Sequence, residues 1–426
     1  MPRILFSTIG SLGDLYPLLS VAIALRARGA ECLFAVHADQ APLVEDEGFA
    51  TMPNLYGLEG TADTLGLSEA ELIRKTFDDP QFLFREILPF DLANVTRQVR
   101  DWMGEVDLVA TTFQAEAARL AAELEGVPVA SLILQPMMVF DPSQPPVIPS
   151  MPPVIAAPGT LGRLWNAGVL RTGMAGIRAM HGHRVNAARR ELGLPRHRGT
   201  PWFDSGVRPV LRLGLYPSLL HDHPPVVDPP VTVTGFTPFE GDAEGLDPAI
   251  AAFLDAGSAP VVFTLGSNAE YLDQDFYAQS LAAARQIGRR AVLLTGKGWG
   301  GVAEGDDVIQ RPYVPHQHLF PRSAAIVHHG GIGTFCRALE AGKPQLVVPF
   351  GTDQPDNAAR AERMGLARTL PAKRYSQARA TEVLGQLLAT SQAEANAERA
   401  AYRMAQEDGP GTAAEAILSA LSARPA

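Results

Sequence analysis

The stretch IVHHGGIGTF, residues 326–335, passes from an apolar run into two histidines and three glycines. The apolar run, which starts at 324, predicts a buried parallel strand, and the residues from Thr334 onward predict a helix that ends at Gly342. Glycines between strand and helix allow positive φ angles and leave backbone N–H groups bare. Because these N–H groups and the helix dipole point the same way, the stretch predicts an anion site at the start of a helix.

Strands and helices alternate along the chain on both sides of this stretch. Short apolar runs rich in β-branched residues predict strands at 4–9, 32–36, 106–111, 127–134, 261–265, 291–295, 308–313, 324–327 and 345–348. Helical patterns separate them, so the sequence predicts an α/β chain with two parallel, doubly wound sheets.

Proline-rich segments interrupt this alternation. Residues 135–160 predict an irregular loop, residues 161–192 predict a helix, and residues 221–242 have the composition of an interdomain linker. We therefore expect an N-terminal domain over 1–225, a C-terminal domain over 226–405, and a last helix within 406–426 that packs back on the N-terminal domain.

The composition restricts the partners and the compartment. A net charge of −10 argues against a nucleic-acid backbone as partner. Two cysteines, Cys32 and Cys336, cannot form a disulfide framework, which favours a reducing cytoplasm. No apolar run reaches the ~18 residues of a spanning helix. We expect a cytoplasmic monomer or homodimer, with peripheral membrane contact left open.

Two loops after neighbouring strands offer groups for a sugar diphosphate. His329 stands before the bare N–H groups and can donate to a phosphate oxygen, whereas His328 is expected to pack. Asp353 and Gln354, which follow the strand at 345–348, combine a carboxylate acceptor with an amide and suit vicinal sugar hydroxyls. The alternatives are a glycine turn that binds nothing and an aspartate that only caps the next helix. Because both loops leave the carboxyl ends of parallel strands, they predict one ligand site.

Two more loops of the second half can add to this site. The ring of Tyr313 could stack on a nucleobase and the backbone of Val314 could pair with its edge; half-buried packing of the tyrosine is the alternative. Ser267 and Asn268 can add hydrogen bonds to a diphosphate or form a plain polar turn.

In the first half, FSTIGSLGDLYPLL (6–19) forms another strand–glycine–helix turn, without the G-x-G-x-x-G spacing of a dinucleotide fold. Asp14 stands at its mouth, either as an N-cap or Asx-turn residue or as a general base that takes the proton of an acceptor hydroxyl. A diphosphate leaving group held by N–H groups and a helix dipole needs neither a protein acid nor a metal. The DQD triplet at 273–275 has the form of a divalent-metal motif, but capping of the next helix explains it better. No metal site is predicted.

Taken together, these residues resemble a known family. HHGGIGTFCRALEAGKPQLVVPFGTDQPDNAARAERMG (328–365) resembles the donor-binding signature of the family-1 glycosyltransferases, inverting enzymes of the GT-B fold. GSLGDLYPLL (10–19) resembles their acceptor-side turn, in the variant with aspartate where many members carry a catalytic histidine. TGFTPFEGD (234–242), VVFTLGSNAEYLDQDFY (261–277) and AVLLTGKG (291–298) look most like bacterial rhamnosyltransferases of the rhamnolipid chain-B type. The resemblance implies two Rossmann-like domains whose parallel sheets face a central cleft.

The resemblance also implies a role for each matching residue. Asp14 would be the general base, beside Gly13 on the acceptor side. The donor would be held by Ser267 and Asn268, by His329, Gly331, Gly333 and Thr334 at the diphosphate, by Asp353 and Gln354 at the sugar, and by Tyr313 and Val314 at the base. Family members move a sugar from a nucleotide donor to a small, often apolar hydroxyl acceptor, and they use no metal or other cofactor.

Arg337 departs from the family pattern. Many UDP-sugar users carry a glutamate at this position, eight residues after the motif histidine, and it holds both ribose hydroxyls. Since a thymidine nucleotide has no 2′-hydroxyl, Arg337 favours a dTDP-linked deoxysugar such as dTDP-rhamnose. A UDP-glucose-dependent glucosyltransferase of the same family is the alternative.

Soft and aromatic side chains of the first half can line an adaptable pocket for a lipid or an aglycone. They are Met137, Met138, Phe140, Trp165, Met174 and Met180. Ordinary core packing is the alternative, and we expect it for most of them. Two other functions stay open: a nucleotide-sugar epimerase, which needs no acceptor pocket, and a non-catalytic nucleotide-sugar-binding auxiliary protein, which needs no carboxylate at position 14.

Overall fold

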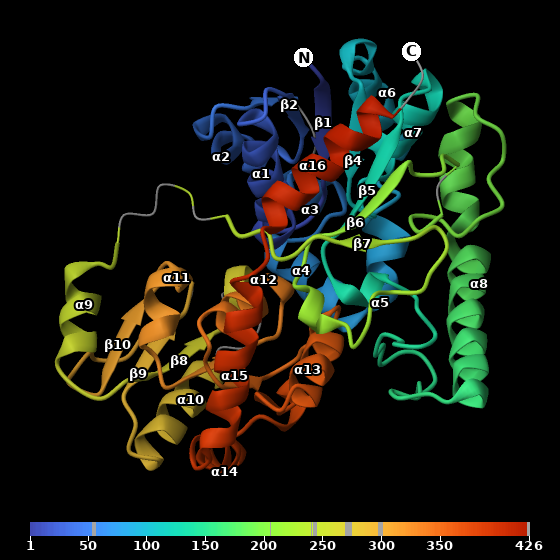
Figure 1. Ribbon diagram of the computed structural model, residues 1–426. Coiled ribbons are helices and arrows are strands. Elements are labelled where there is room, and N and C mark those ends of the chain that lie inside the picture. Colours follow the sequence, from blue (N-terminus) through green and yellow to red (C-terminus); the bar gives the residue numbers. More distant parts are fainter. Residues whose placement is uncertain are drawn as a thin grey trace. The chain divides into compact units, whose positions relative to one another are not determined.

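The chain folds into two compact units (Figure 1). The computed structural model describes residues 1–52, 57–204, 206–239, 241, 245–268, 275–296 and 301–423. The first unit consists of Met1–Phe239 and Asp408–Ala426, and the second is Glu240–Glu407. The second unit is therefore a continuous insertion in the sequence of the first.

The first unit is built on a seven-stranded parallel sheet with the strand order β3-β2-β1-β4-β5-β6-β7. The strands are β1 Arg3–Ser7, β2 Glu31–Ala35, β3 Ala50–Thr51, β4 Leu108–Thr111, β5 Val129–Ile133, β6 Leu211–Gly214 and β7 Thr232–Val233. The helices are α1 Leu12–Arg26, α2 Ala41–Asp46, α3 Leu58–Thr64, α4 Glu69–Asp78, α5 Pro80–Phe82, α6 Leu92–Arg100, α7 Glu116–Glu125, α8 Thr160–Glu191 and α16 Gly409–Ser422.

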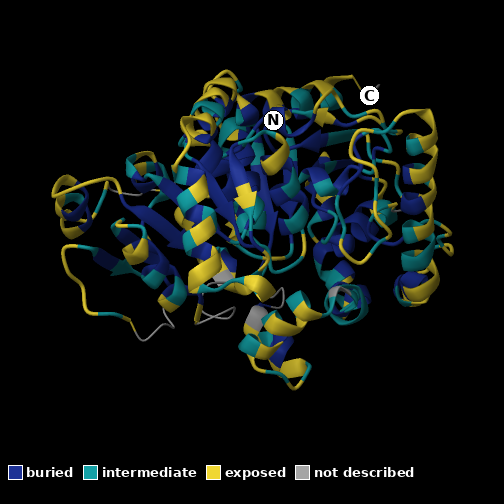
Figure 2. Cartoon of the chain, turned by 90° about the horizontal axis from the view of Figure 1, so that it is seen from below, coloured by how far each residue is buried: buried dark blue, intermediate teal, exposed yellow. Residues whose placement is uncertain are grey.

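Helices cover both faces of this sheet, so successive residues of one strand enter two different cores. Ile4 and Phe6 of β1 pack in a core with α1 and α16, whereas Leu5 packs in a second core with α6 and α7. This explains why the strands are apolar at nearly every position rather than at alternate ones. Figure 2 shows the strands buried and the exposed residues gathered on the outer sides of the helices.

The second unit repeats this architecture with a six-stranded parallel sheet in the order β10-β9-β8-β11-β12-β13. Its strands are β8 Val261–Thr264, β9 Ala291–Leu294, β10 Val308–Arg311, β11 Ala325–His328, β12 Gln345–Val347 and β13 Ala367–Thr369. Its helices are α9 Pro248–Asp255, α10 Asp275–Gln286, α11 His316–Leu319, α12 Ile332–Glu340, α13 Gln354–Arg363, α14 Gln377–Leu388 and α15 Ser391–Met404. Phe263 of β8 packs with α10 and α14, and its neighbour Val262 packs with α9 and α12.

The two predicted parallel sheets are confirmed, but four short strands were missed. These are β3, β6, β7 and β13. The boundary between the units lies within the predicted linker 221–242, but most of that segment belongs to the first unit, since β7 lies inside it and pairs with β6. The first unit therefore continues to Phe239 instead of ending at 225, and the second ends at Glu407 instead of 405.

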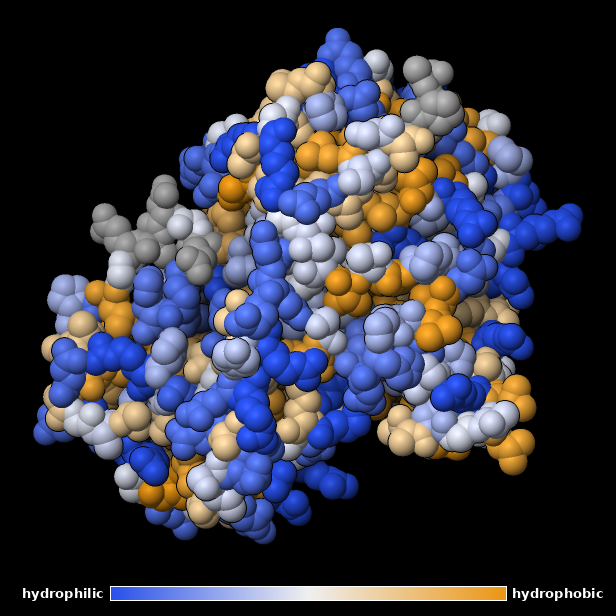
Figure 3. All heavy atoms as spheres, viewed as in Figure 1, coloured by the Kyte–Doolittle hydropathy of each residue, from blue (hydrophilic) through white to orange (hydrophobic). Residues whose placement is uncertain are grey.

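Two helices of the first unit stand out, one by its place in the chain and the other by its length. Helix α16 returns to this unit and packs on α1, where Ala413, Ala414 and Ile417 are fully buried. Helix α8 has 32 residues, and Figure 3 shows hydrophobic side chains gathered at its lower end, where it begins. Within the part of the chain that the structure describes, no helix is long and apolar enough to cross a bilayer.

Candidate active site

The turn between β11 and α12 is held in place by His328. The ring is fully buried, and its Nδ1 atom accepts the Gly330 N–H at 3.0 Å. Burial lowers the pKa of His328 to about 4, so the imidazole is neutral at physiological pH. The proton of a neutral ring must then sit on Nε2, which lies 2.8 Å from Oε1 of Gln345 and donates to it. His328 packs, as predicted, and it also fixes the turn.

Beyond this turn, the start of α12 presents backbone donors. The N–H of Ile332 donates to Oδ2 of Asp353 at 3.2 Å. The N–H groups of Gly331, Gly333 and Thr334 make no hydrogen bond within the described residues. Bare N–H groups at the positive end of a helix dipole bind anions, which is the chemistry predicted from IVHHGGIGTF.

The ring of His329 lies between two glycines. A Cβ atom on Gly266, where φ is +70°, would come within 2.5 Å of its Cε1 atom, and one on Gly331 would come within 2.3 Å of its Nε2 atom. Burial, helped by neighbouring His328 and His316, lowers the pKa of His329 to about 3. The ring is therefore neutral, and its buried Nδ1 atom has no partner among the described residues. Such an imidazole can give a phosphate a hydrogen bond but not a full charge.

Asp353 ties the two predicted ligand loops together. Besides the Ile332 N–H, its Oδ2 atom accepts from Nδ2 of Asn357 at 2.7 Å, and its Oδ1 atom accepts from the Thr352 hydroxyl at 3.0 Å. Burial raises the pKa of this carboxyl group. A carboxylate has about four acceptor positions, so three bonds leave room for one sugar hydroxyl.

The amide oxygen of Gln354 is occupied by backbone N–H groups, whereas its amide nitrogen is available to a ligand. Its Oε1 atom accepts the N–H groups of Phe350 at 2.7 Å and Gly351 at 3.2 Å, while Nε2 makes no hydrogen bond within the described residues. Thr352, two residues earlier, has φ of +54°, a strained conformation for a β-branched residue. The backbone strain lies at the loop that presents Asp353 and Gln354.

The loop after β10 presents an aromatic face and a free backbone donor. The side chain of Tyr313 is 63% exposed, so packing does not explain it. Val314 is buried, yet its N–H makes no hydrogen bond within the described residues. Arg337 on α12 lies close enough to Tyr313 and His316 to influence their pKa values electrostatically. Arg337 forms an ion pair with Glu340 at 2.7 Å. The arginine predicted to select the donor nucleotide therefore lies beside a carboxylate.

The loop after β8 runs beside His329. Strand β8 pairs with β11 so that Thr264 lies opposite His328, and the Thr264 hydroxyl accepts the Gly266 N–H at 3.1 Å. Ser267, the next residue, is exposed. The side chain of Asn268, predicted to contact the diphosphate, lies outside the described residues.

Asp14 in the first unit completes a capping box. Its Oδ2 atom accepts the backbone N–H of Ser11 at 2.9 Å and the Ser11 hydroxyl at 3.3 Å. The Ser11 oxygen in turn accepts the N–H of Gly13 at 3.2 Å. Asp14 is thus the third residue of α1, not its N-cap as one prediction had it, because Ser11 takes that position. Its Oδ1 atom accepts from Nε2 of Gln114 at 3.2 Å.

Gln114 connects Asp14 to a cavity of about 840 Å³ in the first unit. Charged side chains, among them Arg119, Arg208 and Arg212, line part of it. Aromatic and sulfur-containing side chains line another part: Phe113, Met138, Phe140, Met174, Trp202 and Phe203. The Phe113 and Phe203 rings stack at 5.6 Å, and Phe140 meets Phe203 edge-on at 5.5 Å. The predicted residues Met138 and Phe140 are brought together here, whereas Met137 does not line the cavity.

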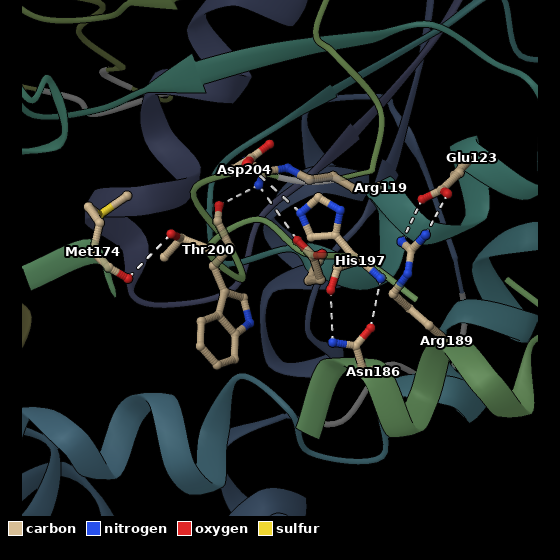
Figure 4. A network of polar contacts seen from close by, with 10 residues as sticks. Arg119, Glu123, Met174, Asn186, Arg189, His197, Thr200 and Asp204 are labelled. Atoms are coloured by element: carbon tan, nitrogen blue, oxygen red, sulfur yellow. Dashed lines mark hydrogen bonds and ion pairs between the residues drawn. The ribbon is translucent and has the colours of Figure 1, made fainter. Parts of the chain in front are cut away.

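A network of polar contacts holds one wall of this cavity, the segment 195–204 (Figure 4). Asn186 of α8 exchanges two hydrogen bonds with the backbone of His197, at 2.8 and 3.0 Å. Arg189, one turn later, donates to the carbonyl of Pro195 at 2.8 Å and forms two bonds of 2.7 Å with Glu123 of α7. Arg119 of α7 donates to the carbonyl of Trp202 at 2.5 Å. The wall is therefore anchored to two helices rather than left as a loose loop.

A metal site is not formed by the described residues, among which no cluster of three His, Cys, Asp or Glu side chains occurs. Asp273 of the DQD triplet lies outside them, and Asp275 begins α10.

Comparison with known proteins places this chain in a family. Residues 301–420 match the family model of the C-terminal domain of erythromycin biosynthesis protein CIII-like proteins. Glycosyltransferase GtfE of Amycolatopsis orientalis is 30% identical over 85% of this chain and 85% of its own. O-mycaminosyltylonolide 6-deoxyallosyltransferase of Streptomyces fradiae is 31% identical over 88% of this chain and 87% of its own. The chain belongs to the family-1 glycosyltransferases.

Solved structures show that this glycosyltransferase has the GT-B fold. The glycosyltransferase of kitacinnamycin matches 98% of this chain and 99% of its own, with a TM-score of 0.72 and 21% identity. VinC, solved in complex with dTDP, matches 99% of both chains with a TM-score of 0.69 and 22% identity.

Several contact residues of the glycosyltransferase were missed by sequence reasoning. Asn357 follows Asp353 by one helical turn, and that spacing could have revealed it. Gln114 lies 100 residues from Asp14, and no local pattern marks their contact. Glu340 follows Arg337 by three residues on one helix, a spacing at which opposite charges pair.

Proposed function

We propose that this glycosyltransferase is inverting and metal-independent, and that it transfers a deoxysugar from a dTDP-linked donor to a hydroxyl group of a small apolar acceptor. The observation that carries the proposal is the start of α12, where Gly331, Gly333 and Thr334 offer unpartnered N–H groups, within the described residues, beside the neutral His329. These donors suit a diphosphate, and they stabilise it further as it leaves with the electron pair of the broken glycosidic bond.

In the proposed reaction Asp14 is the base. Its carboxylate accepts the proton of the acceptor hydroxyl as that oxygen attacks the anomeric carbon of the donor. The carbon–oxygen bond to the diphosphate breaks in the same displacement, and the configuration inverts. Gln114 holds Oδ1 of Asp14 in position. The remaining acceptor position of Asp353 and the Nε2 donor of Gln354 take hydroxyl groups of the sugar.

The choice of a thymidine nucleotide rests on Arg337. A guanidinium group paired with Glu340 has no lone pair to offer the two ribose hydroxyls of UDP. A thymidine nucleotide lacks the 2′-hydroxyl, so it loses less binding free energy when no acceptor faces the ribose. The exposed ring of Tyr313 and the free N–H of Val314 suit stacking on the base and pairing with its edge. A UDP-glucose donor is the second candidate.

The acceptor pocket is proposed to be the cavity beside Gln114. Its phenylalanine and methionine lining suits the apolar body of a lipid or aglycone. Because both cysteines are buried free thiols, we propose a cytoplasmic enzyme.

Calorimetric titration with dTDP and with UDP, each with and without EDTA, tests the donor side. Tighter binding of dTDP that EDTA does not change supports the proposal, and tighter binding of UDP moves the donor to a UDP-sugar. Binding of neither nucleotide would overturn the role given to the α12 turn. Incubation with dTDP-rhamnose and hydroxylated lipids or aglycones, followed by NMR of the product, reports the configuration at the anomeric carbon.

A further inference from the structure

The segment between Asp141 and Glu191 has a charge pattern opposite to that of the whole chain. It contains no aspartate or glutamate, and it contains six arginines, whereas the chain as a whole carries a net charge of −10. Arg163, Arg171 and Arg178 on α8 are exposed and form no ion pair within the described residues. A cationic stripe on an acidic protein requires a separate explanation.

Apolar side chains stand exposed beside these arginines. Leu161 is 82% exposed, Leu164 67%, Trp165 53% and Ile155 45%. Trp165 thus fits neither interpretation given to it from the sequence, because it is exposed and does not line the cavity beside Gln114. The indole N–H of Trp165 donates to the carbonyl of Pro153 at 2.9 Å, so its ring is held in place at the surface.

Arg171 and Arg178 share one face of α8 with the apolar side chains, and Arg163 lies at the edge of that face. Leu161, Leu164 and Trp165 follow the i, i+3, i+4 spacing, and Leu164, Arg171 and Arg178 are seven residues apart. The exposed face thus changes from apolar at the start of the helix, visible in Figure 3, to cationic further along. Nothing in the proposed transfer reaction uses it.

We propose that the start of α8, together with the loop at 151–159, docks the protein onto an anionic lipid surface. Leu161, Leu164 and Ile155 enter the boundary between headgroups and acyl chains, and Trp165 lies at that interface. The three arginines pair with lipid phosphates. This proposal goes beyond the proposed function and does not depend on Asp14 or on the donor.

Charge favours a lipid surface over a second copy of the chain. A symmetric contact between two copies through this face would bring the same arginines together without any carboxylate of their own segment. Anionic headgroups supply the missing negative charge, and the rest of the acidic protein is repelled from them. The docked orientation is therefore set by the patch alone.

Co-sedimentation of the full chain with vesicles tests the proposal. We expect binding to phosphatidylcholine vesicles that contain phosphatidylglycerol, weak binding to phosphatidylcholine alone, and release at high salt. The double variant Leu161→Ser/Leu164→Ser and the triple variant Arg163→Gln/Arg171→Gln/Arg178→Gln should each lower the partition coefficient about tenfold or more. The triple variant Arg374→Gln/Arg379→Gln/Arg403→Gln changes exposed arginines of the second unit and the net charge equally, and it should bind as the parent does.

Trp165 supplies a second readout. The chain has four tryptophans, so the quenching by brominated lipids should be compared between the parent and the Trp165→Phe variant. The part of the quenching that this variant loses is due to Trp165. Absence of binding to anionic vesicles would overturn the proposal, as would equal binding by the parent and both patch variants. Light scattering that shows a dimer abolished by Leu161→Ser/Leu164→Ser would assign the patch to contact between copies instead.

Discussion

Asp14 holds a structural position at the start of α1 and is also the residue proposed as the general base. Its Oδ2 atom closes the capping box with Ser11, and its Oδ1 atom meets Gln114 at the cavity. From the sequence, capping and catalysis were alternative interpretations of this residue. The capping bonds of Asp14 are in place, and its role as a base stays a proposal that kinetics of variants can test.

Replacement of Asp14 by asparagine separates the two roles. The amide oxygen still accepts from Ser11, so we expect the start of α1 to persist. An amide cannot take a proton, so kcat should fall at least about 100-fold, while the Kd for dTDP, measured by calorimetry, stays near that of the parent. Unchanged turnover would remove Asp14 from the mechanism.

The Ser11→Ala variant is the matched control. It removes the hydroxyl of the cap but leaves the Asp14 carboxylate, and it should cost about 1 kcal/mol of stability. Thermal unfolding should show the loss, and turnover should stay within a few-fold of the parent. A loss of turnover as large as that of Asp14→Asn would mean that Asp14 acts only through the helix start.

Gln114→Glu tests whether Gln114 sets the state of Asp14. A second carboxylate beside Oδ1 would raise the pKa of Asp14, since like charges disfavour ionisation. The acidic limb of the profile of kcat against pH should then move to higher pH. A limb that does not move would show that Gln114 does not influence the base.

At the scale of elements, the β11–α12 turn depends on a neutral His328. Its pKa is about 4 in the folded protein against 6.5 for a free histidine, so below pH 6.5 the unfolded chain binds the proton more readily. The stabilisation is complete above pH 6.5 and is lost as the pH falls toward 4, on the order of 3 kcal/mol in all. Urea unfolding at pH 7 and pH 5 should show the second unit weakening, and the His328→Asn variant should be less stable but less dependent on pH. An equal pH dependence in the variant would contradict this account.

The same turn shows what sequence can and cannot predict. The strand, the glycines and the helix of 326–335 are local patterns, and all are present. Strand β7 has two residues and exists only because β6 lies beside it, so no pattern within it could reveal it. The hydrogen bond from the Ile332 N–H to Asp353 joins two loops that are 21 residues apart in sequence. The contact depends on β11 and β12 being neighbours in the sheet, which no local pattern shows. Exposure could not be predicted at Trp165 either, because an aromatic residue type alone favours burial and the 53% exposed side chain depends on where α8 lies.

At the scale of the whole molecule, α16 supplies part of the core of the first unit. Ile417 is fully buried there, so Ile417→Ala should cost about 2–5 kcal/mol. Calorimetry should show a lower melting temperature for the first unit, while dTDP binding by the second unit is retained at low temperature. Ser419→Ala, at an exposed position of the same helix, should leave the melting temperature nearly unchanged. If both variants melt alike, α16 does not stabilise the unit.

The insertion of the second unit between the two parts of the first also sets an order of events during synthesis. A ribosome releases residues 240–407, a complete sheet with its helices, before it releases α16. At about 5–20 residues per second this interval is roughly ten seconds or more. During that time the nascent first domain presents an uncovered apolar face of α1 to the cell, while the later-born domain is free to fold. The domain that begins the chain is thus the last to be finished.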